Sequence, residues 1–117
     1  MIPSPVLGAH VRHNMSSSAH STKNRTRLST ATDFFVPRQV HLVYAHAMQI
    51  DAIGGVGVYA DTQYGGRPMA MMHIDIRDAR PAAGKAMWLR VDGKYISYND
   101  DPANYYAILS NVFRRFP

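Results

Sequence analysis

The sequence predicts an α+β domain in which a small antiparallel sheet is flanked by helices. Two stretches, 38–53 and 102–116, place apolar residues at helical spacing. The segments between them are rich in β-branched and aromatic residues, and Asp92-Gly93 is a strong signal for a two-residue hairpin turn. Because 117 residues leave room for only one modest core, we expect a single domain over residues 1–117.

The N-terminal quarter is expected to be mostly loop. Residues 3–9 have the pattern of a short buried strand, and residues 14–32 are rich in Ser, Thr and Asn, which predicts a long polar loop. The first residues lack the charged and then apolar segments of a secretory signal, and no apolar run approaches the roughly 20 residues that span a bilayer. We therefore expect no signal peptide and no transmembrane segment, and the localisation stays open.

Strands and one helix are expected to follow this loop. ATDFFV, residues 31–36, is apolar and aromatic enough for a strand, which Pro37 ends. The helix over 38–53 should stop at Gly54-Gly55, and GVGVYA then alternates as a strand.

The C-terminal half is expected to hold more β structure and a closing helix. Residues 64–68 predict a Gly-rich turn, and the β pattern resumes in MAMMHIDIR. Residues 86–98 hold the two strands of the Asp92-Gly93 hairpin. The closing helix over about 102–116 should begin near Asp100 or Asp101, either of which can cap its first turn.

Composition restricts the chemistry. There is no cysteine, which excludes disulfides and thiolate metal sites, and all eight acidic residues are Asp. The missing Glu excludes the helical H-E-x-x-H zinc protease mechanism. The net charge is +5, and residues 1–32 contain four basic and no acidic residues, so the loop at 14–32 is expected to attract an anionic envelope polymer. We expect no specific nucleic-acid binding, because the basic residues are not interleaved with aromatics and no recognised motif is present.

One constellation points to a metal site. His73 and Asp75 are two residues apart in a predicted strand, so both should project from one face while Ile74 and Ile76 pack into the core. A catalytic zinc usually takes three His or carboxylate ligands and keeps a fourth position for water. His20, Asp33 and His73 would make such a set.

The order of these motifs resembles the zinc D-alanyl-D-alanine carboxypeptidase-like family of murein peptidases, which shares its fold with the hedgehog signalling domain. The similarity runs from about residue 6 to 95 and rests on the following segments: Ser18-Ala19-His20, Ala31-Thr32-Asp33, Gly54-Gly55-Val56-Gly57-Val58-Tyr59, His73-Ile74-Asp75 and Trp88-Leu89-Arg90. The resemblance implies a zinc metallopeptidase that hydrolyses peptidoglycan stem peptides, such as a phage lysin or a virion-associated hydrolase.

The resemblance also implies residue roles. Zinc would be bound by His20, Asp33 and His73, with His13 as the alternative first ligand. Arg12 would hold a substrate carboxylate. Asp75 would act as general base or orient the zinc-bound water, with Asp61 as the second choice.

A second hypothesis keeps the fold without the activity. In it the chain is an envelope-binding or virion structural module, attached by its basic loop to an anionic polymer or to another protein. Tyr59 and Tyr64 are interpreted as packing residues rather than oxyanion donors. His41 and His46 are five residues apart on a helix and do not share a face, so neither is expected to be a ligand.

Overall fold

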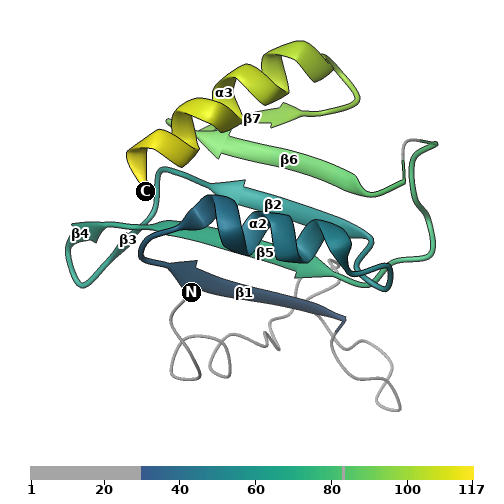
Figure 1. Ribbon diagram of the computed structural model, residues 1–117, viewed down its shortest axis with the longest axis horizontal. Coiled ribbons are helices and arrows are strands. Elements are labelled where there is room, and N and C mark those ends of the chain that lie inside the picture. Colours follow the sequence, from purple (N-terminus) through teal and green to yellow (C-terminus); the bar gives the residue numbers. More distant parts are fainter. Residues whose placement is uncertain (1–29, 83) are drawn as a thin grey trace.

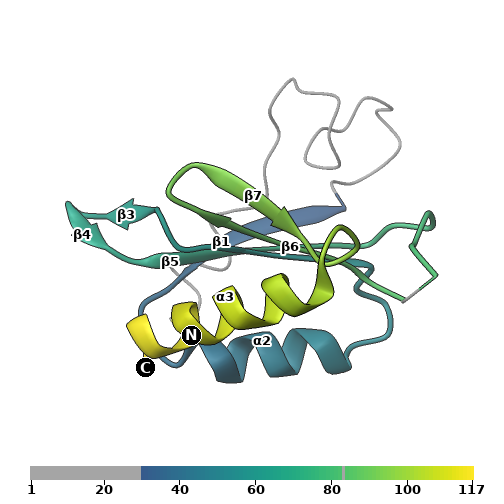
Figure 2. The ribbon, with the colours of Figure 1, turned by 90° about the horizontal axis from the view of Figure 1, so that it is seen from above.

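The structure, a computed structural model, describes residues 30–82 and 84–117 and has a mixed α+β fold (Figure 1). Within these residues, a five-stranded sheet carries two helices on one of its faces, and a short two-stranded ribbon extends from one end of the sheet (Figure 2). The elements in chain order are β1 (Ala31–Val36), α2 (Val40–Gln49), β2 (Gly55–Tyr59), β3 (Gln63–Tyr64), β4 (Arg67–Pro68), β5 (Ala70–Asp75), β6 (Ala86–Val91), β7 (Lys94–Ser97) and α3 (Pro102–Arg115). The strand predicted at 3–9 and nearly all of the loop predicted at 14–32 lie outside the described residues.

The large sheet has the strand order β1-β5-β2-β6-β7 and is mixed rather than antiparallel. Three neighbouring pairs are antiparallel, but β2 and β6 run parallel. The expectation of an antiparallel sheet is therefore wrong at this pair. The reason is the position of β2: it lies between β5 and β6, which run in opposite directions, so it can be antiparallel to only one of them.

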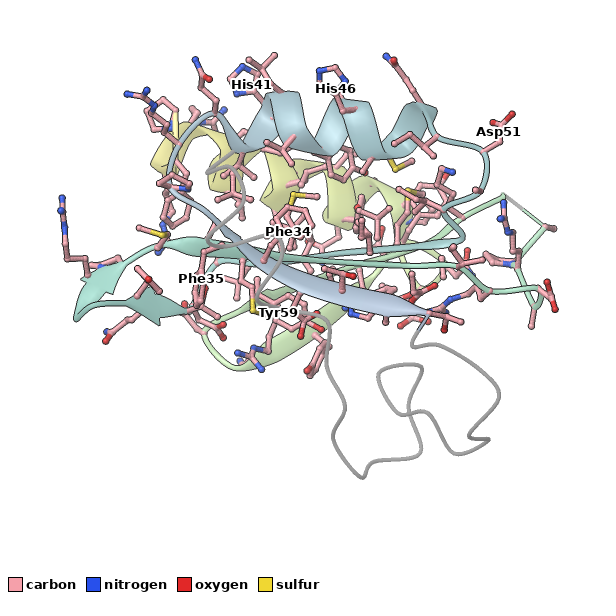
Figure 3. All side chains as sticks on the ribbon, turned by 90° about the horizontal axis from the view of Figure 1, so that it is seen from below. Phe34, Phe35, His41, His46, Asp51 and Tyr59 are labelled. Atoms are coloured by element: carbon pink, nitrogen blue, oxygen red, sulfur yellow. The ribbon has the colours of Figure 1, made fainter. Side chains whose placement is uncertain are left out.

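The core lies between the sheet and the two helices. Alternate residues of each strand point to the helices, as the twofold periodicity of a strand requires, and Phe34, Val56, Val58, Met72 and Leu89 are at most 3% exposed. Figure 3 shows Phe34 directed at the helical layer and Phe35 and Tyr59 directed to the opposite face. From the helices, Tyr44 and Tyr105 enter this core and join their hydroxyls by a 2.9 Å hydrogen bond, which satisfies two buried polar groups.

Several local predictions are confirmed. Asp92 and Gly93 have φ of 52° and 77° and join β6 to β7, as a two-residue turn of type I′ requires. Asp101 caps α3 by accepting a hydrogen bond from the Asn104 amide.

Two boundary predictions are wrong. The first helix ends at Gln49 rather than at Gly54-Gly55, because the backbone is already extended at Ile50, with φ −91° and ψ 109°. Gly54, just before β2, is bonded to the sheet: its amide donates to the Asp75 carbonyl and its carbonyl accepts from the Ala86 amide. Ile76 is 57% exposed rather than buried, since β5 ends one residue earlier, whereas Ile74 does pack against the core. Over the residues that the structure describes, no helix has the length and apolar character needed to cross a membrane.

Candidate functional site

The face of the sheet opposite α2 and α3 presents a row of polar and aromatic residues. Strand register aligns Asp33 of β1 with His73 of β5, His73 with Gly57 of β2, and Gly57 with Trp88 of β6. Residues aligned in this way share a face and lie about 5 Å apart, one strand spacing. Three side chains far apart in the sequence are therefore brought together at the centre of this face.

His73 is held between two carboxylates. Its Nδ1 lies 3.0 Å from Asp33 Oδ1, and its Nε2 lies 2.7 Å from Asp75 Oδ2. All three residues are at most 7% exposed. Burial alone would lower the pKa of His73, but the hydrogen bonds and charges of Asp33 and Asp75 outweigh burial and raise it. Because ionised carboxylates only accept hydrogen bonds, this geometry suits an imidazolium that donates from both nitrogens.

Asp75 is in turn bound by Arg77. Arg77 Nε donates to Asp75 Oδ1 over 2.6 Å, and a second guanidinium nitrogen donates to Asp75 Oδ2. Burial would raise the pKa of Asp75, but Arg77 and His73 outweigh it and bring this pKa down to about 2. A carboxylate that is so acidic and so fully engaged is poorly suited to accept a proton near neutral pH. The arrangement favours a role for Asp75 in orienting His73 over its predicted role as general base.

Trp88 of β6 reaches across β2 to cover His73 of β5. The two ring centroids are 5.1 Å apart, and the Arg77 guanidinium lies 5.4 Å from the Trp88 ring. Trp88 Nε1 also donates to the Tyr59 hydroxyl over 3.0 Å. Arg77 thus reaches His73 by two routes, through Asp75 and through Trp88.

The glycines of β2 make this packing possible. A Cβ on Gly57 would lie 2.5 Å from two ring atoms of Trp88, and a Cβ on Gly55 would lie 2.5 Å from Asp75 Oδ2. Both distances are far below van der Waals contact. The G-x-G of β2 therefore leaves room for Trp88 and for the Asp75 carboxylate to cross the strand.

The predicted site residues fall into three groups. Asp33, His73 and Asp75 come together as described above. Arg12, His13 and His20 lie outside the described residues. The second-choice base, Asp61, instead accepts hydrogen bonds from Arg90 Nε at 3.0 Å and from the Gly93 amide at 2.7 Å.

The other side chains considered from the sequence are accounted for by their surroundings. Tyr59 accepts the Trp88 hydrogen bond, and Tyr64 is 51% exposed on the β3-β4 ribbon, where its ring lies 5.0 Å from that of Phe35. His41 and His46 are exposed on the side of α2 that points away from the sheet (Figure 3).

The contacts of Asp61 with Arg90 and Gly93 are expected to stabilise the fold in a pH-dependent way. Burial would raise the pKa of Asp61, but the Gly93 amide and Arg90 outweigh it and lower this pKa. The lowered pKa means that the contact stabilises the fold above the ordinary pKa of 3.8 and is lost as the pH falls through the folded value. We expect Asp61→Asn to lower the unfolding free energy at neutral pH by about 1 kcal/mol or less, because the pair is partly exposed. Urea unfolding near pH 7 and near pH 3 measures this difference, which should shrink at the lower pH; an equal difference at both would contradict the assignment.

Arg77 is the residue that sequence reasoning missed. A signal was present, because His73, Asp75 and Arg77 alternate along the chain and alternate residues of a strand share a face. Arg77 is the last residue of the predicted strand MAMMHIDIR, whereas β5 ends at Asp75, so Arg77 reaches the Asp75 carboxylate from the segment that follows the strand.

The Asp33–His73 pair is compatible with a metal. Tetrahedral zinc with bonds of about 2.0–2.1 Å separates two ligand atoms by about 3.4 Å, and Asp33 Oδ1 and His73 Nδ1 are 3.0 Å apart. Asp75 behind Nε2 is the usual partner of a metal-binding histidine. Within residues 30–82 and 84–117, no three His, Asp, Glu or Cys side chains group as a metal site.

Comparison of the chain with protein-family models, with curated proteins and with solved structures gives no match.

Proposed function

We propose that the chain is a zinc peptidase domain of the D-alanyl-D-alanine carboxypeptidase-like type, with the fold of the hedgehog domain, and that it cuts stem peptides of peptidoglycan. The observation that carries the proposal is the pair formed by Asp33 and His73. These residues belong to separate motifs forty positions apart, and strand register places them side by side with Asp75 behind the imidazole.

Asp33 and Nδ1 of His73 would hold the metal once Nδ1 has given up its proton, as metal binding by histidine requires. The third ligand would be His20, or His13 in its place. Bound zinc lowers the pKa of its water to about 7 and polarises a carbonyl. In this proposal Asp75 keeps the imidazole oriented through Nε2, and Arg77 holds Asp75. Arg12 remains the candidate for the substrate carboxylate.

A second candidate function is supported by the hydrogen bonds of His73. Both ring nitrogens have carboxylate partners and Arg77 pairs with Asp75, so the Asp33–His73–Asp75 cluster is electrostatically satisfied without a metal ion. A site of this kind also suits a non-catalytic module that binds an anionic envelope polymer or a virion subunit.

A measurement of zinc binding distinguishes the peptidase from the non-catalytic binding module. We expect zinc added to metal-stripped protein to raise its melting temperature, because a ligand that binds only the folded state stabilises it, by about 2.7 kcal/mol at a hundredfold excess over the dissociation constant. His73→Ala and Asp33→Ala should lose this stabilisation, and Asp75→Asn should weaken zinc binding about 10- to 100-fold without abolishing it. Calorimetric titration and zinc-dependent cleavage of stem peptides are the measurements.

His46→Ala is the matched control, because His46 is exposed on α2 away from the site and should bind zinc as the parent does. If zinc gives the parent no stabilisation, the peptidase proposal is wrong. Zinc binding without cleavage of any stem peptide would favour the binding module. Unchanged zinc affinity with lost cleavage in Asp75→Asn would restore Asp75 as the general base.

A further inference from the structure

A second cluster of side chains lies on the same face of the sheet, one step along the strands from His73. It consists of Tyr59, Arg90 and Tyr95, together with Asp61, and is called the aromatic ledge below. Tyr59, Arg90 and Tyr95 are aligned with one another across β2, β6 and β7. Tyr59 lies two residues after Gly57 on β2, and Arg90 lies two residues after Trp88 on β6. About 7 Å therefore separates the ledge from the row that contains His73.

The ledge is held together by stacking. The Arg90 guanidinium lies 4.8 Å from the centroid of the Tyr59 ring and 5.9 Å from that of Tyr95. The two tyrosine rings meet edge to face at 6.1 Å. Tyr59 is also fixed by the hydrogen bond from Trp88, which links the ledge directly to the candidate site.

Charge on the ledge is balanced. Both oxygens of Asp61 accept from Arg90 Nε, at 3.0 and 3.1 Å, so the guanidinium is paired internally. Tyr95 is nevertheless 63% exposed, which is unusual for a large aromatic residue that packs against its neighbours. The result is a surface with exposed aromatic carbon and hydrogen-bonding groups but little net charge.

Such a surface fits a ligand that is itself neutral and has one apolar face. The pyranose ring of an N-acetylhexosamine has this character, because its axial C–H groups pack on an aromatic ring while its hydroxyls and acetamido group bond to planar polar side chains. A stem peptide carries free carboxylates, and the paired Arg90 offers them no uncompensated cation. The chemistry of the ledge therefore favours sugar over peptide.

We propose that the aromatic ledge binds N-acetylhexosamine rings of the wall glycan beside the peptide that enters the His73 site. The inference rests on the proposed function for its choice of polymer. It assigns to Tyr95 the main stacking contact, to Arg90 and Asp61 the polar contacts, and to Tyr59 the connection to the site.

The test uses the full chain and a tetramer of β-1,4-linked N-acetylglucosamine, which contains the sugar and no peptide. Titration followed in two-dimensional amide NMR spectra should shift resonances of residues 59, 90 and 95 first. Tyr95→Ala should weaken binding about two- to tenfold, the usual effect of losing one aromatic contact. Tyr95→Phe keeps the ring and should bind nearly as the parent does.

Tyr106→Ala is the control, since Tyr106 is a 51% exposed tyrosine on α3, in the helical layer, and should not affect sugar binding. The proposal is overturned if the tetramer shifts no ledge resonance, if Tyr95→Ala binds it as tightly as the parent, or if a free stem peptide shifts the ledge resonances and the tetramer does not. Because the titration needs neither zinc nor cleavage, the two proposals fail separately. Sugar binding by a protein that takes no zinc would support the ledge and reject the peptidase, and zinc-dependent cleavage without sugar binding would reject the ledge alone.

Discussion

Replacing Arg77 with methionine is expected to destabilise the fold by about 2–4 kcal/mol. The substitution leaves the Asp75 carboxylate, whose side chain is 0% exposed, with His73 as its remaining charged partner among residues 30–82 and 84–117. Removing one member of a buried ion pair is costly because the other charge stays desolvated. We expect the lower part of the usual range, since the Arg77 side chain is itself 35% exposed. Chemical unfolding at neutral pH measures the effect.

The pH dependence of this loss identifies its origin. The pKa of Asp75 is lowered from 3.8 to about 2, so its stabilising contribution is complete above 3.8 and disappears as the pH falls through 2. The difference between the parent and Arg77→Met should therefore shrink over that window. Arg80→Met is the matched control: Arg80 is an exposed arginine of the same loop, bonded to the backbone carbonyls of Arg77 and Ala52, and its loss should cost much less. Equal losses in the two variants would mean that the Asp75 contact contributes little.

Gly57→Ala is expected to cost about 1–3 kcal/mol and to displace Trp88. The added methyl would lie 2.5 Å from Trp88 Cε2 and Nε1, and the ring cannot yield without losing its contacts with His73, Arg77 and the Tyr59 hydroxyl. Because Trp88 is the single tryptophan of the chain, its fluorescence reports the displacement directly.

A second substitution tests the cause. Trp88→Leu removes the ring that the methyl would strike, so Gly57→Ala should cost less in a Trp88→Leu background than in the parent. The difference is a coupling energy of the kind expected between residues in contact. Additive costs would show that alanine harms β2 for a reason unrelated to Trp88.

The elements of the fold that depend on neighbouring residues could be predicted from the sequence. The pairing of strands that are far apart in the sequence could not. The Asp92-Gly93 turn and the Asp101 cap act within a few residues, so their signals are visible in the sequence. The parallel pairing of β2 with β6 depends on which strand occupies the gap beside β5, and no short segment encodes that choice.

The candidate site divides in the same way. The alternation of His73 and Asp75 predicted that both share a face, and the structure agrees. The sequence did not predict that His73 and Asp75 would be buried or that Arg77 and Trp88 would surround them. This packing depends on Gly55 and Gly57, which belong to another strand. The glycines were visible as a motif, but their purpose becomes clear only from the register that places them beside Asp75 and Trp88.

Strand order also determines how late in folding the Asp33–His73 pair can form. The β6-β7 hairpin closes over two residues and can form locally, whereas β5 must insert between β1 and β2, both of which precede it in the chain. Bringing Asp33 and His73 together closes a loop of about forty residues, and the entropy of that loop is lost before the two residues gain any contact. Such non-local pairing slows folding. The pair therefore forms only when β1 docks on β5, and a folding intermediate that contained only the β6-β7 hairpin and α3 would have no site at all.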